Sequence, residues 1–499
     1  MIRRRTITSY VWNSVSGNKM VILSNCIRNF FRKFELLGNS TQGENPAPDN
    51  PQEIKSVGRK SKNLFNIADL RVGQVQKDGT INEKSTHYRT AILDVPEDAK
   101  YRIAFKINTD YNMLYFTDAY INGVYSNPYV KVYGGNSGSL ISLKNGKNIL
   151  SFRATKDDAT IDFPKDHNIM IAAESETLGY EPYGYFFDVK ITGKNLFSNK
   201  SADWQIGKGL SWSTYPNDPI SIYRVINSAV NVINLKPSTT YSIVNNSEKI
   251  VISRMIERNL SENGIKDHDV RSSKYTFVTN QNAMNAILQL KKVDGTELLS
   301  SDIESIKIML VEGDIDESTP YEPYTEQSVQ IALDEPLRGI GDYKDVLTKD
   351  GVVRRIKQIT VDEKSNLIFY TESKNTFGYL VKVPDATQTN YIYSVISDRF
   401  VKTQYIDSND TNGVVTLFGK QIIFRVSKEI ANSIDALKEW LANNNITFNY
   451  VLESPITEPL PESVQAQLSA LHSENGTTHV FVDFGEVEAG INIEYKYKS

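Results

Sequence analysis

Apolar and polar residues alternate along many short segments of this chain. In KYRIAFKI (100–107), Tyr101, Ile103, Phe105 and Ile107 occupy every second position. A period of two is typical of a strand that buries one face. Comparable runs recur in NILSFRA, MNAILQLKKV, IKIMLV, FGYLVKV and KQIIFRV, separated by turn residues. The pattern therefore predicts a mainly β protein.

One segment has helical periodicity instead. In SIDALKEWLANN (433–444), apolar residues recur at the spacing of a helix face, at Ile434, Leu437, Trp440 and Leu441. Ser433 stands where a helix N-cap is expected. We therefore predict one short helix within a β-rich C-terminal part.

Two short phrases occur twice, and two others recur in similar form, all in the same order. KNLF begins at Lys62 and Lys194, and YEPY begins at Tyr180 and Tyr321. Between them VPEDAKYRI resembles LKPSTTYSI, and NIMIAAE resembles KIMLVEG. Four landmarks in one order indicate an internal duplication. Since each copy holds many short strands and no long helical pattern, we predict tandem β-sandwich or jelly-roll modules.

These landmarks divide the chain into five predicted segments. They are a basic arm with a Pro-rich connector (1–61), a first β-sandwich module (62–190), a second module that repeats it (194–330), a β-rich C-terminal domain with the helix near 433–444 (336–470), and a terminal β segment (471–499). In the connector, Pro46, Pro48 and Pro51 exclude a helix or a central strand. The last segment alternates as an edge strand that needs a partner strand.

The first 33 residues are rich in Arg and Lys and contain no acidic residue. Such a segment fits a transit peptide, or a basic arm that docks on an acidic neighbour. Asn25, Arg28 and Arg32 interrupt its apolar part, which disfavours a secretory signal.

Composition excludes several classes of protein. The net charge of −4 gives no overall basic field, so we predict no nucleic-acid partner. The single cysteine, Cys26, excludes an internal disulfide framework and a Cys-based zinc cluster. No apolar run approaches the roughly 18 residues of a membrane span, so we predict no membrane insertion.

From Phe34 to the C-terminus, the order of phrases resembles tail or baseplate (minor structural) proteins of phages that infect Gram-positive bacteria. The phrases are GNSTQGENPAPDNPQEIKSVG, KNLF, KPSTTYSI, IKIMLVEG, YEPY, LRGIGDYKDVLTKDGVVRRI and EWLANNNITFNYVLESPITEPL. The resemblance implies a virion protein of the phage tail, assembled in the cytoplasm of the bacterial host. It also implies contacts with other tail and baseplate proteins, a homotrimer, and β-rich modules that meet the host surface.

Two segments have the composition of a sugar-binding surface, with flat rings for stacking beside Asn, Asp and Ser side chains. They are ADWQIGKGLSWSTYPNDP and DAYINGVYSNPYVKVYGG. The carbohydrate-binding candidates are Trp204, Trp212, Tyr215, Tyr120, Tyr125, Tyr129 and Tyr133. The alternative is that these rings fill a core or cover strands.

Signals for catalysis and metal binding are weak. GGNSGSL resembles the segment around the nucleophile of trypsin-like proteases and would nominate Ser137, but His87 lacks the matching context, so a turn between strands is favoured. Neighbouring strand residues point to opposite faces, so Asp267, His268 and Asp269 cannot offer three ligands from one strand, and a solvated loop is favoured. We predict no enzyme, no cofactor and no metal site.

The predicted function is therefore non-catalytic recognition of a host cell-surface glycan by a phage tail or baseplate protein. Three alternatives stay open. They are a bacterial surface adhesin or carbohydrate-binding protein, a tail-borne glycan depolymerase, and a scaffold without a ligand.

Overall fold

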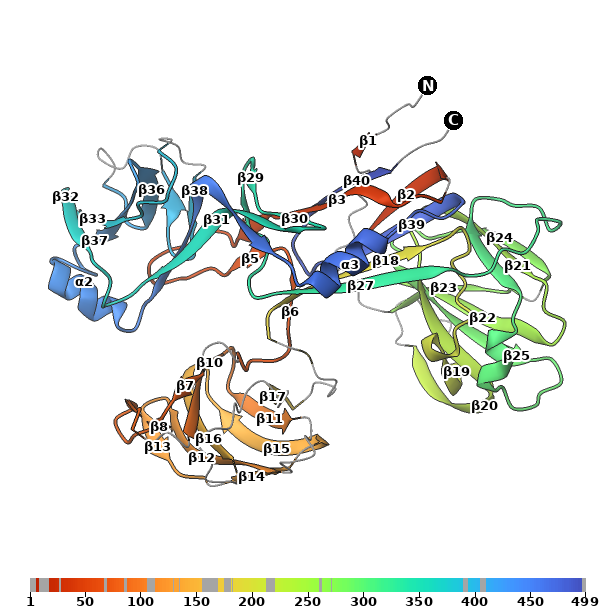
Figure 1. Ribbon diagram of the computed structural model, residues 1–499, viewed down its shortest axis with the longest axis horizontal. Coiled ribbons are helices and arrows are strands. Elements are labelled where there is room, and N and C mark those ends of the chain that lie inside the picture. Colours follow the sequence, from red (N-terminus) through yellow and green to blue (C-terminus); the bar gives the residue numbers. More distant parts are fainter. Residues whose placement is uncertain are drawn as a thin grey trace. The chain divides into compact units, whose positions relative to one another are not determined.

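The fold is given by a computed structural model of the chain (Figure 1). It describes residues 6–8, 18–26, 28–66, 70–84, 88–105, 113–128, 130–133, 135–154, 169–174, 181, 183–211, 220–259, 263–270, 272–388, 394–403 and 410–495. Strands dominate these residues, and their α-helices are short: α1 (Ser300–Glu304), α2 (Ile434–Leu441) and α3 (Glu462–Ala470). The predicted mainly β class is confirmed.

The chain divides into two compact units. The large unit comprises Met1–Val57, Asp188–Gln330 and Leu337–Ser499, and the small unit comprises Gly58–Phe187 and Ile331–Pro336.

The small unit contains two main antiparallel sheets. One has the order β7 (Arg71–Val72), β10 (Tyr88–Val95), β16 (Gly146–Ala154), β12 (Met113–Ile121), β13 (Val124–Ser126), with β14 (Val130–Tyr133) also paired to β12. The other has the order β15 (Gly135–Leu143), β11 (Ala99–Phe105), β17 (Ile169–Ala173). The alternation predicted for β11 buries Tyr101 and Ile103 in one core with Leu150 and Phe152.

Residues 194–330 of the large unit also form two sheets around one core. The first has the order β19 (Gln205–Ser211), β20 (Ser221–Asn234), β25 (Asn285–Lys292), β22 (Ile250–Arg258), β23 (Gly264–His268). The second has the order β24 (Lys274–Val278), β21 (Thr240–Asn245), β26 (Ile308–Glu312). This strand order matches that of the small unit in both sheets, except that β14 has no counterpart here. The module boundaries and the duplication itself stay predictions.

Asn195 explains why KNLF and YEPY recur together. Its side-chain amide donates to the carbonyls of Ile308 (3.2 Å) and Glu322 (3.0 Å). Its side-chain oxygen accepts from the backbone N–H groups of Phe197 (2.9 Å) and Leu310 (3.1 Å). One buried side chain thus ties the KNLF segment to β26 and to YEPY.

Asn63 makes the equivalent contacts in the small unit. Its amide donates to the carbonyls of Ile169 and Glu181, both at 3.0 Å. Its oxygen accepts from the N–H groups of Phe65 and Ile171, both at 2.9 Å.

The N-terminal segment predicted as an arm contributes strands to two sheets. β2 (Asn18–Cys26) pairs with β39 (Gly476–Asp483). The sheet continues from β39 to β18 (Tyr185–Thr192) and β27 (Glu326–Leu333). β3 (Phe31–Leu37) pairs with β40 (Gly490–Tyr495) and β30 (Val346–Thr348). β40 lies between β1 (Thr6–Thr8) and β3, so it is an inner strand of its sheet.

The Pro-rich segment is a loop within a hairpin. β4 (Ser40–Gln42) pairs with β5 (Ile54–Ser56), and the prolines lie between them. Arg399 donates to the carbonyl of Pro48, and the N–H of Gln52 donates to the carbonyl of Asp398 at 2.6 Å. The loop is therefore attached to the C-terminal part of the same unit.

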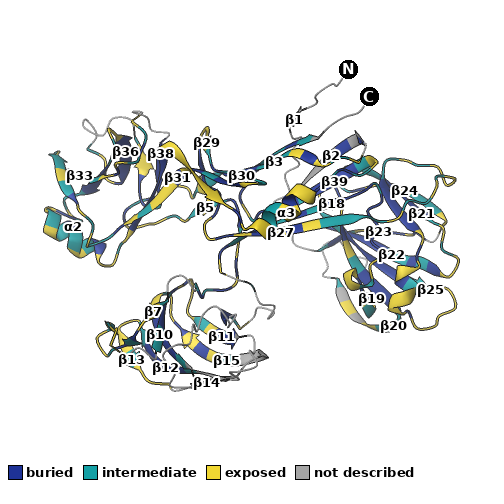
Figure 2. Cartoon of the chain, in the orientation of Figure 1, coloured by how far each residue is buried: buried dark blue, intermediate teal, exposed yellow. Residues whose placement is uncertain are grey.

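The C-terminal part surrounds a separate core that includes the predicted helix. Its strands include β31 (Gly351–Val361) and β38 (Ile446–Pro459), and the sheet β32 (Ile368–Glu372), β33 (Thr376–Lys382), β37 (Gln421–Ser427), β36 (Val414–Phe418), β35 (Val401–Lys402). In α2, Leu437 and Leu441 are buried, and the Ser433 hydroxyl accepts from the N–H of Ala436 at 3.1 Å. Figure 2 shows that exposed and intermediate residues make up the side of α2 that is in view. The helix and its N-cap are confirmed.

Candidate functional site

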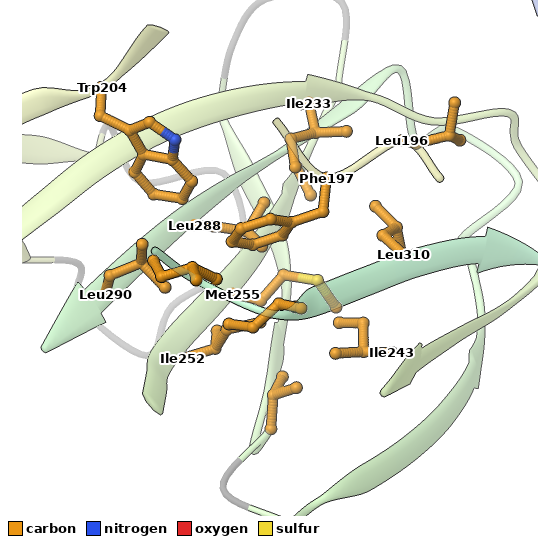
Figure 3. Close-up of a cluster of buried hydrophobic side chains, with 14 of the residues drawn as sticks. Leu196, Phe197, Trp204, Ile233, Ile243, Ile252, Met255, Leu288, Leu290 and Leu310 are labelled. Atoms are coloured by element: carbon orange, nitrogen blue, oxygen red, sulfur yellow. The ribbon is translucent and has the colours of Figure 1, made fainter. Parts of the chain in front are cut away.

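Trp204, a predicted sugar-binding residue, lies in the core of the second module. Its ring is 5% exposed and packs on Phe197, with ring centroids 5.4 Å apart (Figure 3). Its indole N–H donates to the carbonyl of Ser198 at 2.9 Å, so the polar edge is satisfied internally. The prediction for Trp204 is corrected, because a buried ring offers no face to a sugar.

Tyr120 and Tyr125 face each other across β12 and β13 and are half-buried. The Tyr125 hydroxyl donates to the buried carboxylate of Asp118 at 2.6 Å, and Asn127 donates to the same oxygen at 3.0 Å. The hydrogen bond to Asp118 raises the pKa of Tyr125. The mixture of Tyr and Asn in this segment thus serves an internal network, and a role in sugar binding stays a prediction.

Other predicted residues lie outside the described part. Trp212, Tyr215, Tyr129 and His87 are among them, and Tyr133 lies in β14 with a side chain that is not described.

Ser137 lies inside β15, so the prediction of a turn at GGNSGSL was wrong.

His268 is a buried residue at the end of β23, and the prediction of a solvated loop was wrong. Pairing with β22 brings its Nε2 to 2.5 Å from a carboxylate oxygen of Glu257, and its Nδ1 lies 3.0 Å from the Tyr275 hydroxyl. Glu257 also accepts from the N–H of Asn280 at 2.7 Å. Both ring nitrogens have protein partners. Among the described residues, no group of three or more His, Cys, Asp or Glu is placed to hold a metal ion.

A pocket of about 360 Å³ lies in the large unit. It is lined by aromatic rings and polar side chains, the groups that a sugar-binding site needs. β18 (Tyr185–Thr192) and β39 form its floor, and β20 and the KNLF and YEPY segments form its walls. Its lining includes two rings, Tyr324 and Phe481, and eight polar residues: Asp188, Lys190, Thr192, Ser198, Asp203, Asn231, Asn234 and Asp483.

The strand register explains why the floor residues share one face. Asp188 pairs with Asp483 and Lys190 pairs with Phe481, two positions further along each strand. Alternate residues of a strand point to the same side of its sheet. The carboxylates of Asp188 and Asp483 therefore lie on the same side of the sheet as Lys190 and the Phe481 ring, which are two positions further along the strands.

The Tyr324 ring is held by charged neighbours. The ammonium groups of Lys190 and Lys200 each lie 5.7 Å from its centroid. Both also pair with Glu326, at 3.0 Å and 3.1 Å, and Glu326 accepts from the Tyr324 hydroxyl. These contacts restrain the ring as one wall of the pocket.

The same contacts shift two pKa values. Burial acts to raise the pKa of Glu326, but hydrogen bonds from Tyr324, Lys190 and Lys200 outweigh it and lower that pKa to about 2. Burial and the hydrogen bond to Glu326 raise the pKa of Tyr324, so its hydroxyl stays protonated.

Two buried polar atoms beside the pocket have no hydrogen-bond partner. They are Oγ1 of Thr192, which lines the pocket, and Nε2 of His479, the residue paired with Thr192 across the two strands. The Nδ1 of His479 lies 2.9 Å from the carbonyl of Gly193, and burial lowers the pKa of this imidazole. Both atoms are buried beneath the pocket lining and are not accessible to a ligand in the pocket.

A second pocket, of about 400 Å³, lies in the C-terminal part. Its lining includes Lys357, Asp385 and Tyr450, which bond one another through Asp385. Among its described lining residues, the one aromatic ring, Tyr450, is 1% exposed. This pocket offers no ring face and is the weaker candidate.

Comparisons with known proteins supply no family. No protein-family model and no curated protein matches the chain. The arabinofuranosyltransferase AftD from Mycobacteria is 8% identical, with a TM-score of 0.14 over 93% of this chain and 36% of that chain. The structure of infectious bursal disease virus Gx strain is 6% identical, with a TM-score of 0.09 over 98% of this chain and 83% of that chain. Similarity this low does not indicate a shared fold.

None of the helices in the described ranges is long and apolar enough to span a bilayer.

Proposed function

We propose that this chain is a structural protein of a phage tail or baseplate that recognises a host-surface glycan by non-catalytic binding. The observation that carries the binding role is the pocket above β18 and β39. It combines two rings with carboxylate, amide and hydroxyl groups. The order of sequence phrases supports the virion role.

This chemistry suits a sugar because a pyranose ring has apolar C–H faces and a rim of hydroxyl groups. Tyr324 and Phe481 offer ring faces, while Asn231 and Asn234 offer donors and acceptors. A single shallow site of millimolar affinity contributes only about 4 kcal/mol. A homotrimer would therefore bind a surface strongly through avidity.

The test is binding of the full chain to a glycan array and to cell-wall polysaccharide. Replacing Tyr324 by Ala removes a ring wall and should weaken binding about tenfold, whereas Tyr324→Phe keeps the ring and should retain most affinity. Asn234→Ala should weaken binding, and Asn282→Ala, an exposed site outside the pocket, should not. Absence of binding to every glycan would favour a scaffold, and release of reducing ends would favour a depolymerase.

Detection of the chain in purified phage particles tests the virion role separately. A host adhesin would instead be found on bacteria that produce no particles.

A further inference from the structure

We propose that His479 makes the joint between the second module and β39 labile to mild acid, so that the pocket in this joint opens as the pH falls. The joint is the contact between residues 194–330 and the face of β18 and β39 that lines the pocket, within the large unit. Its response to acid would be the same whichever ligand the pocket takes, so it does not rest on the proposed function.

His479 lies on the side of the sheet that faces the second module. Phe481, two residues further along β39, packs against the core of that module. Alternate residues of a strand point to the same side of its sheet, so the imidazole faces the module as well. The two rings are stacked, with centroids 6.3 Å apart. The pocket is lined by Leu196 and Ser198 of the module and by Phe481 of β39, so a separation at the joint would open it.

The hydrogen bonding of His479 suits only the neutral imidazole. The ring is 1% exposed, and its Nδ1 lies 2.9 Å from the carbonyl of Gly193. A carbonyl oxygen only accepts, so Nδ1 carries the proton of the neutral ring and donates it. Nε2 is then the atom that takes up a second proton, and it is buried without a hydrogen-bond partner. A proton there would create a buried cation whose new N–H has no acceptor.

The charged groups on the module side do not compensate such a cation. Glu312 acts to raise the pKa of the imidazole and Lys236 acts to lower it, but burial is the largest effect and the pKa is lowered. The two groups also pair with each other at 2.9 Å. On the strand side, β18 places Thr192 opposite the imidazole and Lys190 two residues away, and β2 places Ile22 opposite it.

Three further charged groups lie near this part of the chain. Lys194 follows the carbonyl that holds the ring, and it pairs with Glu322 at 3.3 Å. Glu474 accepts from Gln327 at 3.1 Å. Asp483 lies four residues further along β39. None of these carboxylates accepts a hydrogen bond from the imidazole, so a proton on Nε2 needs water, which reaches it when the joint opens.

The sign of the pH dependence follows from the lowered pKa. In the open joint the imidazole is hydrated and titrates near its usual value of 6.5, and in the closed joint its pKa is lower. The closed joint is therefore fully favoured above pH 6.5, and this preference is lost as the pH falls below 6.5. The binding of one proton changes the opening equilibrium constant by at most about tenfold per pH unit.

The test is hydrogen–deuterium exchange of the full chain at about pH 7.5 and about pH 5.5, corrected for the intrinsic pH dependence of exchange. When the module leaves this face, β18 and β39 lose the packing that protects their backbone amides. Exchange in both strands should therefore become severalfold faster at the lower pH. β33 and β37 belong to the separate core of the C-terminal part and should show no change.

His479→Asn is the decisive variant, because the asparagine amide can still donate to the carbonyl of Gly193 and cannot take up a proton. Exchange in β18 and β39 should then be the same at both pH values. His472→Asn is the matched control. The Nε2 of His472 lies 3.9 Å from a carboxylate oxygen of Glu474, so a proton there gains an acceptor, and this variant should keep the acid response.

Unchanged exchange in the wild type between the two pH values would overturn the proposal. An acid response that persists in His479→Asn, or that disappears in His472→Asn, would do the same. If His479→Asn does not fold, His479→Phe, which also has no titratable group, provides the same comparison.

Discussion

At the scale of single residues, Asn63 and Asn195 explain why the same short sequence, KNLF, occurs in both modules. Each asparagine makes four hydrogen bonds to the backbone of three segments. No other side chain offers a carbonyl and an amide in this geometry with so little volume. The repeated letters were visible in the sequence because the contact depends on this residue type.

Replacing Asn195 by Ala should lower the free energy of unfolding of its module by about 3 kcal/mol. Each of the four bonds contributes roughly 0.5–1.5 kcal/mol, and the groups left behind are buried. Urea unfolding measures the loss, and Asn63→Ala should cost a similar amount in the small unit. Asn199→Ala, a nearby site whose side chain makes a long, exposed hydrogen bond, serves as control and should cost little. A loss below about 1 kcal/mol for Asn195→Ala would contradict the role given to this side chain.

Glu326 gives a prediction about pH. Its pKa falls from the usual 4.5 to about 2 in the folded chain, so its contribution to stability is present above pH 4.5. That contribution is lost as the pH falls from 4.5 towards 2. The stability difference between the wild type and Glu326→Gln should therefore be constant above pH 4.5 and shrink below it. Chemical unfolding at a series of pH values measures the difference, and one that does not change with pH would exclude the ion pairs with Lys190 and Lys200 as its source.

Candidate site residues were harder to predict than the repeat. Trp204 stands among polar residues in the sequence, yet its ring is buried because its N–H has a backbone partner inside the module. The pocket residues Asp188, Lys190, Phe481 and Asp483 were missed, since β18 and β39 are far apart in the sequence. In YFFDVKIT, Asp188 and Lys190 stand two positions apart, which places both charges on one face of a strand. This spacing and the second YEPY were the features of the sequence that could have indicated the pocket.

At the scale of strands and helices, the local pattern of apolar and polar residues predicted where strands lie. It did not predict which strands pair with one another. β11, β25, β33 and α2 follow from alternation, helical spacing and an N-cap, which are properties of neighbouring residues. β2 and β3 pair with strands at the other end of the chain, and no local pattern reports such a contact. The sequence therefore predicted an arm for the N-terminal segment, whereas the structure shows that this segment supplies strands to two sheets.

The central position of β39 and β40 predicts the effect of truncation. β39 lies between β2 and β18, and β40 lies between β1 and β3. Deleting residues 471–499 should therefore leave the large unit unable to fold, since it removes inner strands and exposes sheet edges. Deleting residues 496–499 leaves β40 intact and should have little effect on solubility or circular dichroism. A soluble, cooperatively unfolding chain that ends at residue 470 would contradict the observed pairing.

At the scale of the whole molecule, the chain holds two modules of one strand order in two different compact units. The small unit has its own core around Ile103 and Phe152, and the second module has its core around Tyr241 and Leu288. Domains with separate cores can unfold as separate cooperative units. The arrangement therefore makes a prediction that does not depend on the ligand.

Scanning calorimetry should show more than one unfolding transition, and the two asparagines should identify them. Asn63→Ala should lower the transition of the small unit, and Asn195→Ala should lower a different one. A loss of about 3 kcal/mol in a module of roughly 100 to 150 residues corresponds to a shift of roughly 10 °C, which is easily resolved. If both variants lowered the same transition equally, the modules would be one cooperative unit, and the two cores would not act as separate domains.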